Sequence, residues 1–593
     1  MNLGVARALV PLLAVVAGQP ATPAPQPAHA SRAAVPATTA DKTLAVRLEP
    51  FRAFSGAPPA GWSEPAFDDR AWVGPAPGPF APRQPPLPGS AQPPANVTLF
   101  DAIPNQPLLL RARFAVPEAS RARVLELRVA YNDGFVAYVN GREVARRGIA
   151  SQAVQAAAPH GPEIERVYVA VPGDVSLTPE ANQLAVAVYP YSGRNLVIPT
   201  APAAFVGLAV ASGVRIVRGP YLAGPAEART KARMNVIWET DLPAAGKVVV
   251  EPAEAPPGTQ AAAREVATGP RAMRQLVPLN ALERGAGYRY RVELEAAPGD
   301  RAASVPARFE TLPAPPAPLR FAVYGDMRYP GHQAHRAVIE ALVREAPALV
   351  INTGDLTDVG SEEANWQRYF DITAPLGAIA PVIPALGNHD AARSGVGALK
   401  TWQLFAMPKP APPFYTSIDL GGVHFVVLDT NDGGSEQREW LKDDLARARR
   451  HDARAIFAFC HEPPWSHGLH GDSHRLKRDY APLLAAGHVD ALLCGHDHIY
   501  ERGTGPTPKG ELTYIVTGGG GAPLYNPRCQ AASGQLPGDV PGPLPPCPPT
   551  VAVLTKTYHY VMITVAPDGI QLCPKRPDGS AVEPCVGLPP HRR

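Results

Sequence analysis

This sequence is poor in cysteine, in net charge and in long apolar stretches, and each shortage excludes a class of protein. Six cysteines among 593 residues are too few for a fold that depends on a disulfide framework. A formal net charge of +3 gives no reason to expect a nucleic-acid-binding module or attraction to an acidic membrane. Beyond the N-terminus no stretch approaches the roughly 18 apolar residues of a membrane helix, so we expect no membrane span in the mature chain.

The cysteines also lack zinc-ribbon spacing, and a glycine-rich stretch near residue 520 lacks the lysine of a P-loop. Two cysteines, Cys460 and Cys494, follow predicted strands and are expected to stay reduced. The other four allow three connectivities. Among these we expect the local one, which pairs Cys529 with Cys547 and Cys573 with Cys585.

The first 43 residues are typical of an export leader followed by a linker. Arg7 precedes the apolar run 8–17, and small residues suited to cleavage follow it. We expect a signal peptide over residues 1–18, with cleavage as late as residue 30, and a disordered Ala/Pro-rich linker over residues 19–43. The mature chain would then be secreted, or periplasmic or extracellular, where disulfides form.

The length of 593 residues suggests several domains, and residues 44–212 show the periodicity of the first. Apolar and polar side chains alternate from Leu110 to Val116, and Asn140-Gly141 is a strong signal for a two-residue hairpin. Because no helical pattern interrupts this region, we expect an all-β sandwich of jelly-roll type.

The segments YNDGFVAYVNGREV and NQLAVAVY of this sandwich make it similar to galactose-binding-like accessory domains. The resemblance implies a fold that often binds carbohydrate, and Trp62 and Trp72 are the side chains that would stack on a sugar. We favour a packing role for both tryptophans, and carbohydrate stays open as a partner of this domain.

Residues 214–312 predict a second all-β unit. The segments MNVIWET, KVVV and YRYRV are short strands rich in β-branched and aromatic side chains. About seven such strands fit a fibronectin-type sandwich, and a proline-rich linker follows it.

Five short apolar runs between residues 319 and 500 each end in side chains that bind metal ions. These side chains are Asp326, Asp355, Asn388 with His389, His461, and His496 with His498. Helical patterns over residues 335–344 and 436–450 separate the runs and predict parallel βαβ units. Because the carboxyl ends of such strands meet at one edge of a sheet, we expect these ligands to gather there. Oxygen and imidazole ligands suit two divalent or trivalent metal ions.

The motif order Gly-Asp, Gly-Asp, Gly-Asn-His-Asp, His and Gly-His-Asp-His over residues 319–565 resembles the calcineurin-like metallophosphoesterases, and most closely their purple acid phosphatase branch. The strands of residues 214–312 look like the domain that precedes the catalytic one in that branch. The resemblance implies two all-β sandwiches followed by an α/β domain of αββα type at residues 319–570, with a proline-rich insertion at 522–549 and a tail at 571–593.

The resemblance also implies how the metals are held. Asp355 would bridge two ions, which are iron, manganese or zinc in this family. The first ion would take Asp326, Asp355 and His498, and the second would take Asp355, Asn388, His461 and His496.

Two positions depart from the family pattern. Where many metallophosphoesterases have a histidine ligand this chain has Arg328, and where purple acid phosphatases have the tyrosine that gives their colour it has Asp358. Our hypothesis is that Asp358 or His335 completes the first metal shell and that the protein is not purple. The guanidinium of Arg328 matches a phosphoryl group, and a contact with substrate or a structural ion pair are both open for it.

By the same resemblance, His389 stabilises the transition state or protonates the leaving alcohol. We expect the adjacent Asp390 to fix its tautomer and raise its basicity. The nearby histidines 467, 470 and 474 face substrate or are ordinary loop residues, with equal weight.

The leading interpretation is a secreted hydrolase with two metal ions, in which metal-activated hydroxide attacks a phosphate ester, as in an acid phosphatase acting on monoesters. Two alternatives remain: a phosphodiesterase of the same fold, and a carbohydrate-binding surface protein with a degenerate metal site. A structural adhesin built of β modules would leave the ligand set unexplained.

Overall fold

The computed structural model of the chain describes residues 42–76, 80–82, 98–100, 106–131, 134–149, 164–189, 204–228, 230–254, 262–328, 332–391, 395–408, 411–533, 540 and 542–588. The expected signal peptide and residues 19–41 of the expected linker lie outside these ranges. Within them, no helix is both long enough and apolar enough to cross a membrane.

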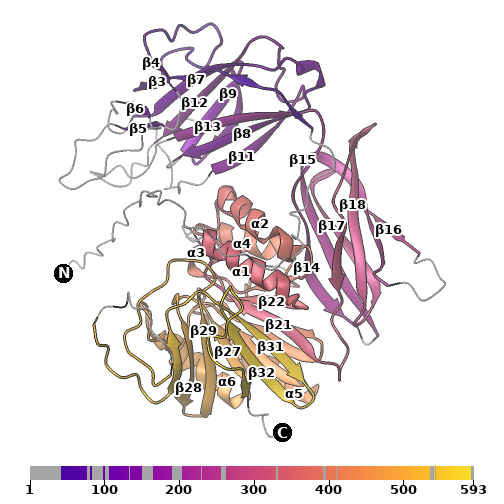
Figure 1. The fold of residues 1–593 in the computed structure, drawn as a ribbon, viewed down its shortest axis with the longest axis vertical. Coiled ribbons are helices and arrows are strands. Elements are labelled where there is room, and N and C mark those ends of the chain that lie inside the picture. Colours follow the sequence, from indigo (N-terminus) through magenta and orange to yellow (C-terminus); the bar gives the residue numbers. More distant parts are fainter. Residues whose placement is uncertain are drawn as a thin grey trace, which may run out of the picture. The chain divides into compact units, whose positions relative to one another are not determined.

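The first domain is a sandwich of two sheets (Figure 1). Its strands are β1 Thr43–Leu44, β2 Arg47–Leu48, β3 Phe51–Ser55, β4 Val73–Ala76, β5 Phe80–Pro82, β6 Thr98–Phe100, β7 Leu108–Ala115, β8 Val124–Tyr131, β9 Gly134–Val139, β10 Arg142–Arg147, β11 Ile164–Ala170, β12 Asn182–Tyr189 and β13 Ala204–Ala211. One sheet has the order β11-β8-β13-β5-β6 with β1 beside β13, and the other has β10-β9-β12-β7-β3-β4 with β2 beside β7. A short 3-10 turn, Ala119–Arg121, joins β7 to β8.

Strand β7 shows why the sequence alternates. Leu110, Ala112 and Phe114 point into the core between the two sheets, because side chains two residues apart share a face of a strand. The predicted hairpin between β9 and β10 is also present. Asn140 and Gly141 both have left-handed backbone, with φ of 51° and 80°, as the tight hairpin turn requires.

The two tryptophans considered for sugar stacking are buried. Trp62 is 8% exposed and Trp72 is 7% exposed. They stack on each other with ring centroids 6.4 Å apart and pack against Leu109 on the opposite face of β7. Their burial is what the packing role requires.

The second domain contains β14 Ile216–Glu227, β15 Lys231–Pro252, β16 Arg264–Ala267, β17 Ala272–Glu283, β18 Gly287–Ala297, β19 Asp300–Ala303 and β20 Ala307–Glu310. The long strand β15 joins its two halves. Residues 231–244 pair with β14 and β17, and residues 245–252 pair with β16 and β18. Trp238 of β15 is fully buried in this core.

The third domain has two mixed sheets. Their strands are β21 Leu319–Tyr324, β22 Leu349–Asn352, β23 Val382–Pro384, β24 Thr416–Leu420, β25 Val423–Val427, β26 Ala455–Phe459, β27 Ala491–Cys494, β28 Tyr500–Thr507, β29 Gly510–Thr517, β30 Val551–Thr555, β31 Tyr560–Ala566, β32 Gly569–Lys575 and β33 Val586–Leu588. The sheet orders are β23-β22-β21-β31-β32-β33 and β24-β25-β26-β27-β29-β28-β30. The pairs β21–β22, β22–β23, β25–β26, β26–β27 and β27–β29 are parallel.

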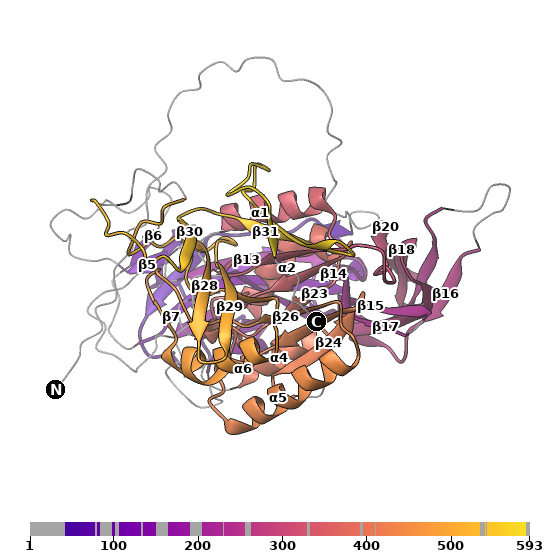
Figure 2. The ribbon, with the colours of Figure 1, turned by 90° about the horizontal axis from the view of Figure 1, so that it is seen from below.

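Helices cover the outer faces of this pair of sheets. The helices of this domain are α1 His332–Glu345, α2 Glu363–Gly377, α3 Asn388–Ala391, α4 Val396–Leu404, α5 Ser435–Arg450 and α6 Ala481–Ala486, with a π-helical turn at Leu476–Tyr480. Apolar residues of α1 and α2 pack on the first sheet, and those of α5 and α6 pack on the second (Figure 2). Between the sheets, the Phe321 ring meets those of Phe425 and Phe457 at centroid distances of 5.2 and 5.4 Å.

The C-terminal part of the chain differs from the expected tail. The expected boundary at residue 570 falls inside β32, and β33 pairs with β32 at the edge of the first sheet. Apolar side chains at Ile570, Leu572 and Leu588 explain this, because they pack into the core between the sheets.

Both expected disulfides, Cys529–Cys547 and Cys573–Cys585, are formed. Cys460 and Cys494 are buried thiols.

Candidate metal centre

The third domain brings the six predicted ligands together at the carboxyl ends of its strands. Each ligand lies in the segment that directly follows β21, β22, β23, β26 or β27, so both sheets contribute. Three of the ligands, Asp326, Asp355 and His496, have left-handed backbone, with φ of 60°, 54° and 71°. Non-glycine residues rarely adopt this conformation, and it concentrates at functional sites.

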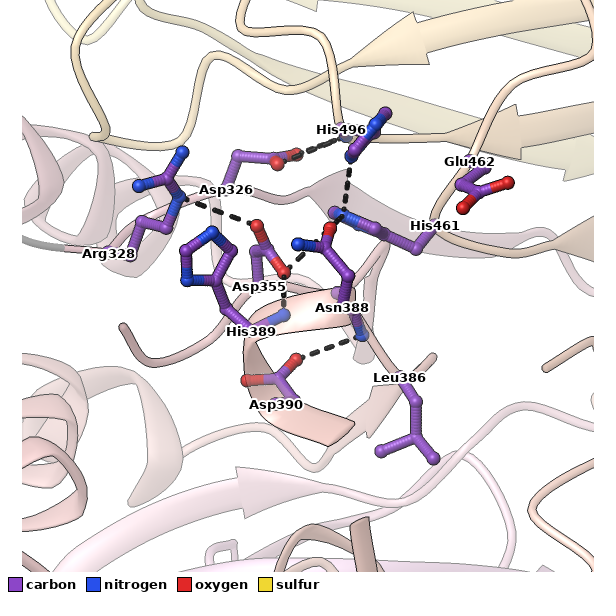
Figure 3. A network of polar contacts seen from close by, with 12 residues as sticks. Asp326, Arg328, Asp355, Leu386, Asn388, His389, Asp390, His461, Glu462 and His496 are labelled. Atoms are coloured by element: carbon purple, nitrogen blue, oxygen red, sulfur yellow. Dashed lines mark hydrogen bonds and ion pairs between the residues drawn. The ribbon is translucent and has the colours of Figure 1, made fainter. Parts of the chain in front are cut away.

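Four candidate metal-ligand atoms form the tightest part of the centre. The Nε2 atom of His461 lies 3.0 Å from Asn388 Oδ1, 3.1 Å from His496 Nδ1 and 3.4 Å from Asp355 Oδ1. Figure 3 shows these side chains turned toward one another. Ligand atoms of Asp326, Asp355 and His461 also lie within 4.8 Å of one another.

Backbone carbonyls orient two of the imidazoles. His461 donates Nδ1–H to the Thr353 carbonyl over 3.0 Å, and His498 donates Nδ1–H to the Pro523 carbonyl over 2.6 Å. Each ring then directs its Nε2 atom toward the centre, as metal-binding histidines do.

Both Nε2 atoms face oxygen atoms of other ligands. His461 Nε2 faces another acceptor, Asn388 Oδ1. The Nε2 atom of His498 is buried without a hydrogen-bond partner among the described residues, and lies 3.6 Å from Asp326 Oδ1. Acceptors that converge in this way are satisfied by a cation, so the residues present fit a metal centre.

Burial shapes the charges of the centre. It raises the pKa of Asp326 to about 8, and the nearby Asp355 adds to that rise. Burial also disfavours ionised Asp355, but the charges of His461, His389 and Arg328 outweigh it and lower the pKa of that carboxyl. A cation beside both carboxylates removes the repulsion between them.

Two of the histidines are held neutral, which is the form that binds metals. Burial lowers the pKa of His496 to about 2 and that of His498 to about 3. An imidazole without a proton on its ligating nitrogen keeps its lone pair available over the physiological pH range.

Asp390 does not orient His389 as the sequence analysis expected. Its carboxylate accepts hydrogen bonds from the backbone N–H groups of Gly387, Leu356 and Thr357 over 3.1 to 3.2 Å. The reason is the short helix α3, which turns consecutive side chains in different directions. Asp390 therefore ties the Asn388 loop to the Asp355 loop.

The tautomer of His389 is fixed instead by a backbone carbonyl. Its Nδ1–H donates to the carbonyl of Asp358 over 2.7 Å, so Nε2 is the nitrogen that can exchange a proton. The side chain is 30% exposed, and its backbone N–H donates to Asp355 Oδ1 over 3.1 Å. The ring therefore lies at the edge of the centre, accessible to a substrate.

Arg328 lies inside the centre. Its Nε is 3.4 Å from Asp355 Oδ2, its Nη1 is 3.6 Å from Asp358 Oδ1, and its Nη2 donates to the Tyr525 hydroxyl over 3.1 Å. Figure 3 shows the guanidinium beside Asp355. Arg328 therefore faces Asp355 and Asp358, two acidic residues of the segment that follows β22.

His335 packs among aromatic side chains. It is 1% exposed and sits between the rings of Tyr324 and Tyr369, with centroid distances of 6.1 Å to each. Burial lowers its pKa to about 3. The cluster of ligand atoms found among the described residues does not include it.

Asp497, the residue between the two histidines of the Gly-His-Asp-His motif, was not singled out in the sequence. Its buried carboxylate accepts bonds from Ser466 Oγ, His470 N and Gly471 N over 2.5, 2.8 and 3.1 Å. These bonds hold the loop whose His470 ring stacks on His496 with centroids 4.1 Å apart. A carboxylate inside a ligand motif was the signal that could have found it.

The remaining loop histidines behave differently. His467 pairs with the buried carboxylate of Glu501 over 2.9 Å, and His474 is exposed. Tyr525 stacks on His498 with centroids 4.0 Å apart and meets the His470 ring at 5.5 Å. The position of Tyr525 after a glycine-rich stretch does not predict its contact with His498.

The domain that carries this centre is similar to known phosphoesterases. Residues 319–500 match the model of the calcineurin-like phosphoesterase family. Purple acid phosphatase 23 of Arabidopsis thaliana is 30% identical over 266 residues, which cover 38% of this chain and 57% of that protein. An uncharacterised protein of Mycobacterium tuberculosis is 26% identical over 296 residues, covering 38% of this chain and 56% of that protein.

A solved structure extends the similarity of the fold. The purple acid phosphatase from yellow lupin seeds aligns with a TM-score of 0.54 at 16% identity, covering 80% of this chain and 92% of that chain. The expected fold is thereby confirmed: a sheet-rich N-terminal region precedes a metallophosphoesterase domain. In sequence, this chain spans about half the length of the curated relatives that it matches.

Proposed function

We propose that residues 319–500 form a calcineurin-like phosphoesterase domain and that this chain hydrolyses phosphate esters at the centre around His461. The observation that carries the proposal is the convergence of Asp355, Asn388 and His496 on the Nε2 of His461, within 3.0 to 3.4 Å. We propose phosphomonoesters as the substrates, by similarity to the purple acid phosphatases.

The chemistry of the metal enters in one way. When bound, a metal ion at such a centre lowers the pKa of water toward neutrality and offsets charge on the phosphoryl oxygens. Asn388 contributes a neutral oxygen, so it adds no negative charge that would repel a phosphate ester.

The other residues bind the ester and move a proton. Arg328 offers guanidinium N–H groups, whose planar fork matches phosphoryl oxygens. His389 keeps Nδ1–H on the carbonyl of Asp358, so its Nε2 carries the proton that the leaving alcohol receives. Asp390 positions the Asn388 loop and Asp497 positions the His470 loop through the backbone bonds described above.

We also propose that the protein is exported. The leader-like N-terminal sequence supports this, and so do the disulfides Cys529–Cys547 and Cys573–Cys585, because disulfides persist in oxidising compartments. Carbohydrate binding by the first domain has weaker support, since the indole faces of Trp62 and Trp72 are buried.

The test is hydrolysis of p-nitrophenyl phosphate and of bis(p-nitrophenyl) phosphate by the purified chain with manganese, zinc or iron added. We expect faster turnover of the monoester and its loss in Asn388→Ala and His461→Ala. The exposed His451 at the end of α5 gives a matched control, His451→Ala, which should keep full activity. Turnover of the diester alone would replace the monoesterase assignment with a diesterase. Absence of turnover with all three metals would refute the proposal.

A further inference from the structure

We propose that this centre retains one metal ion tightly and that Arg328 weakens the second metal position, so that the second ion exchanges readily. The proposal rests on the metal centre proposed above. It addresses the departure of this chain from the two-ion pattern that its sequence resembles.

The first step concerns the two oxygens of Asp355. One oxygen, Oδ1, lies 3.4 Å from His461 Nε2 and faces the tight cluster of donors. The other, Oδ2, lies 3.4 Å from the Nε of Arg328. The Asp355 carboxylate would be shared between two ions. One of its oxygens already lies beside the other ligands, and the second lies beside the guanidinium of Arg328.

The second step compares the two positions. The tight position has four donors, which are Asp355 Oδ1, Asn388 Oδ1, His461 Nε2 and His496 Nδ1. Among the described residues, the other position has Asp326 and His498 besides the shared Asp355, with His498 Nε2 3.6 Å from Asp326 Oδ1. A full shell of four protein ligands holds a metal more firmly than two ligands and a share in a third.

The third step concerns the two residues expected to complete the weaker shell. Asp358 has its carboxylate 3.6 Å from Arg328 Nη1, so its charge is already offset. His335 is buried between two tyrosine rings. Neither residue belongs to the cluster of ligand atoms found among the described residues.

The fourth step is electrostatic. The guanidinium carries its charge at every accessible pH, and three partners, Asp355, Asp358 and Tyr525, fix it in place. It is mostly buried, with 19% of its side chain exposed, so water screens it weakly. A cation bound at Asp326 and His498 would meet that fixed positive charge beside their common neighbour Asp355.

The test is the metal content of the chain after it is loaded with zinc or manganese and passed through a desalting column. We expect about one equivalent retained by the unaltered chain and about two by Arg328→His, which supplies a neutral imidazole ligand in place of the cation. Arg328→Gln removes the charge alone and should tighten the second site by about tenfold or more in a calorimetric titration. Arg450→Gln, at the exposed end of α5, is the control and should match the unaltered chain.

Two equivalents retained by the unaltered chain, with no change in Arg328→Gln, would overturn the proposal. So would an unaltered chain that retains no metal, and that result would overturn the proposed metal centre as well. One retained equivalent in a chain that hydrolyses no phosphate ester would leave this inference standing and refute the proposed function.

Discussion

Single residues of this centre act as often through positioning as through direct contact. Asp497 lies between His496 and His498 in sequence, yet among the described residues its carboxylate accepts from the loop that carries Ser466 and His470. Residues that orient the groups around a metal commonly contribute as much as a weak ligand. The positioning residues therefore give the most discriminating substitutions.

We predict that Asp497→Asn lowers kcat/KM for p-nitrophenyl phosphate about 10- to 100-fold. The neutral amide weakens the bonds that seat His470 over His496, while all six metal ligands remain. Elemental analysis should therefore find unchanged metal content. A parallel loss of metal would show that Asp497 also supports the metal ligands.

A second prediction concerns Gly387, whose lack of a side chain leaves room for Asp355. A Cβ atom at this position would lie 2.0 Å from Asp355 Oδ1. We expect Gly387→Ala to displace that carboxylate, to lower metal affinity and to destabilise the domain by about 1–3 kcal/mol.

The matched control is Gly587→Ala, since nothing lies within 4 Å of a Cβ built there. Chemical unfolding and metal titration should separate the two variants. Equal stability and equal metal affinity of the two variants would contradict the close approach of Gly387 to Asp355.

At the scale of elements, His424 links the β24–β25 hairpin to helix α5. Its Nδ1 lies 2.6 Å from Asp419 Oδ1 and its Nε2 lies 2.9 Å from Asp444 Oδ2. Burial disfavours the imidazolium, but the two carboxylates outweigh it and raise the pKa of His424 to about 9. The histidine is therefore charged in the folded protein at neutral pH.

This arrangement predicts how stability depends on pH. Because the folded pKa lies above the ordinary value of about 6.5, the contribution of His424 is fully present below pH 6.5 and is lost as pH rises toward 9. Breaking a buried pair costs about 3–5 kcal/mol, so we expect His424→Gln to destabilise the protein by that order at pH 6.

The measurement is the free energy of unfolding of both proteins from pH 6 to pH 9.5. The difference between them should shrink across that window. A difference that stays constant would mean that the imidazole is neutral in the folded state.

The elements themselves were largely predictable, because periodicity determines them locally. The alternation at Leu110 to Phe114 and the apolar runs before Asp326 and Asp355 have the expected strand positions. Strand β33 was missed because its three residues, Val586–Leu588, gain stability from pairing with β32 rather than from their own pattern. Tertiary pairing of this kind leaves little trace in a short segment.

The candidate site was also predictable only in part. Ligands that follow strands could be assigned, since parallel strand ends share an edge. The partners of Asp390 and Arg328 could not, because they depend on the turn of α3 and on a guanidinium reaching residues more than twenty positions away in the sequence.

At the scale of the whole molecule, the metal centre joins the two sheets of the third domain. Asp326, Asp355 and Asn388 follow strands of the first sheet, and His461, His496 and His498 follow strands of the second. A metal ion bound by both groups stabilises the folded state, because the unfolded chain does not hold the ligands together.

We therefore predict that removing metal with a chelator lowers the melting temperature of this domain. A ligand present at about 100 times its dissociation constant contributes about 2.7 kcal/mol, which corresponds to a shift of roughly 5–10 °C for a domain of this size. Differential scanning calorimetry should show the shift, and added zinc should reverse it. The Asn388→Ala variant should respond much less to the chelator.

The most direct measurement of the central claim is a crystal structure of the metal-loaded protein with anomalous scattering recorded at the absorption edge of the metal. We predict a strong anomalous peak bounded by Asp355 Oδ1, Asn388 Oδ1, His461 Nε2 and His496 Nδ1, with a weaker peak or none beside Asp326 and His498. A peak elsewhere in the chain, or no peak among these four atoms, would contradict the account.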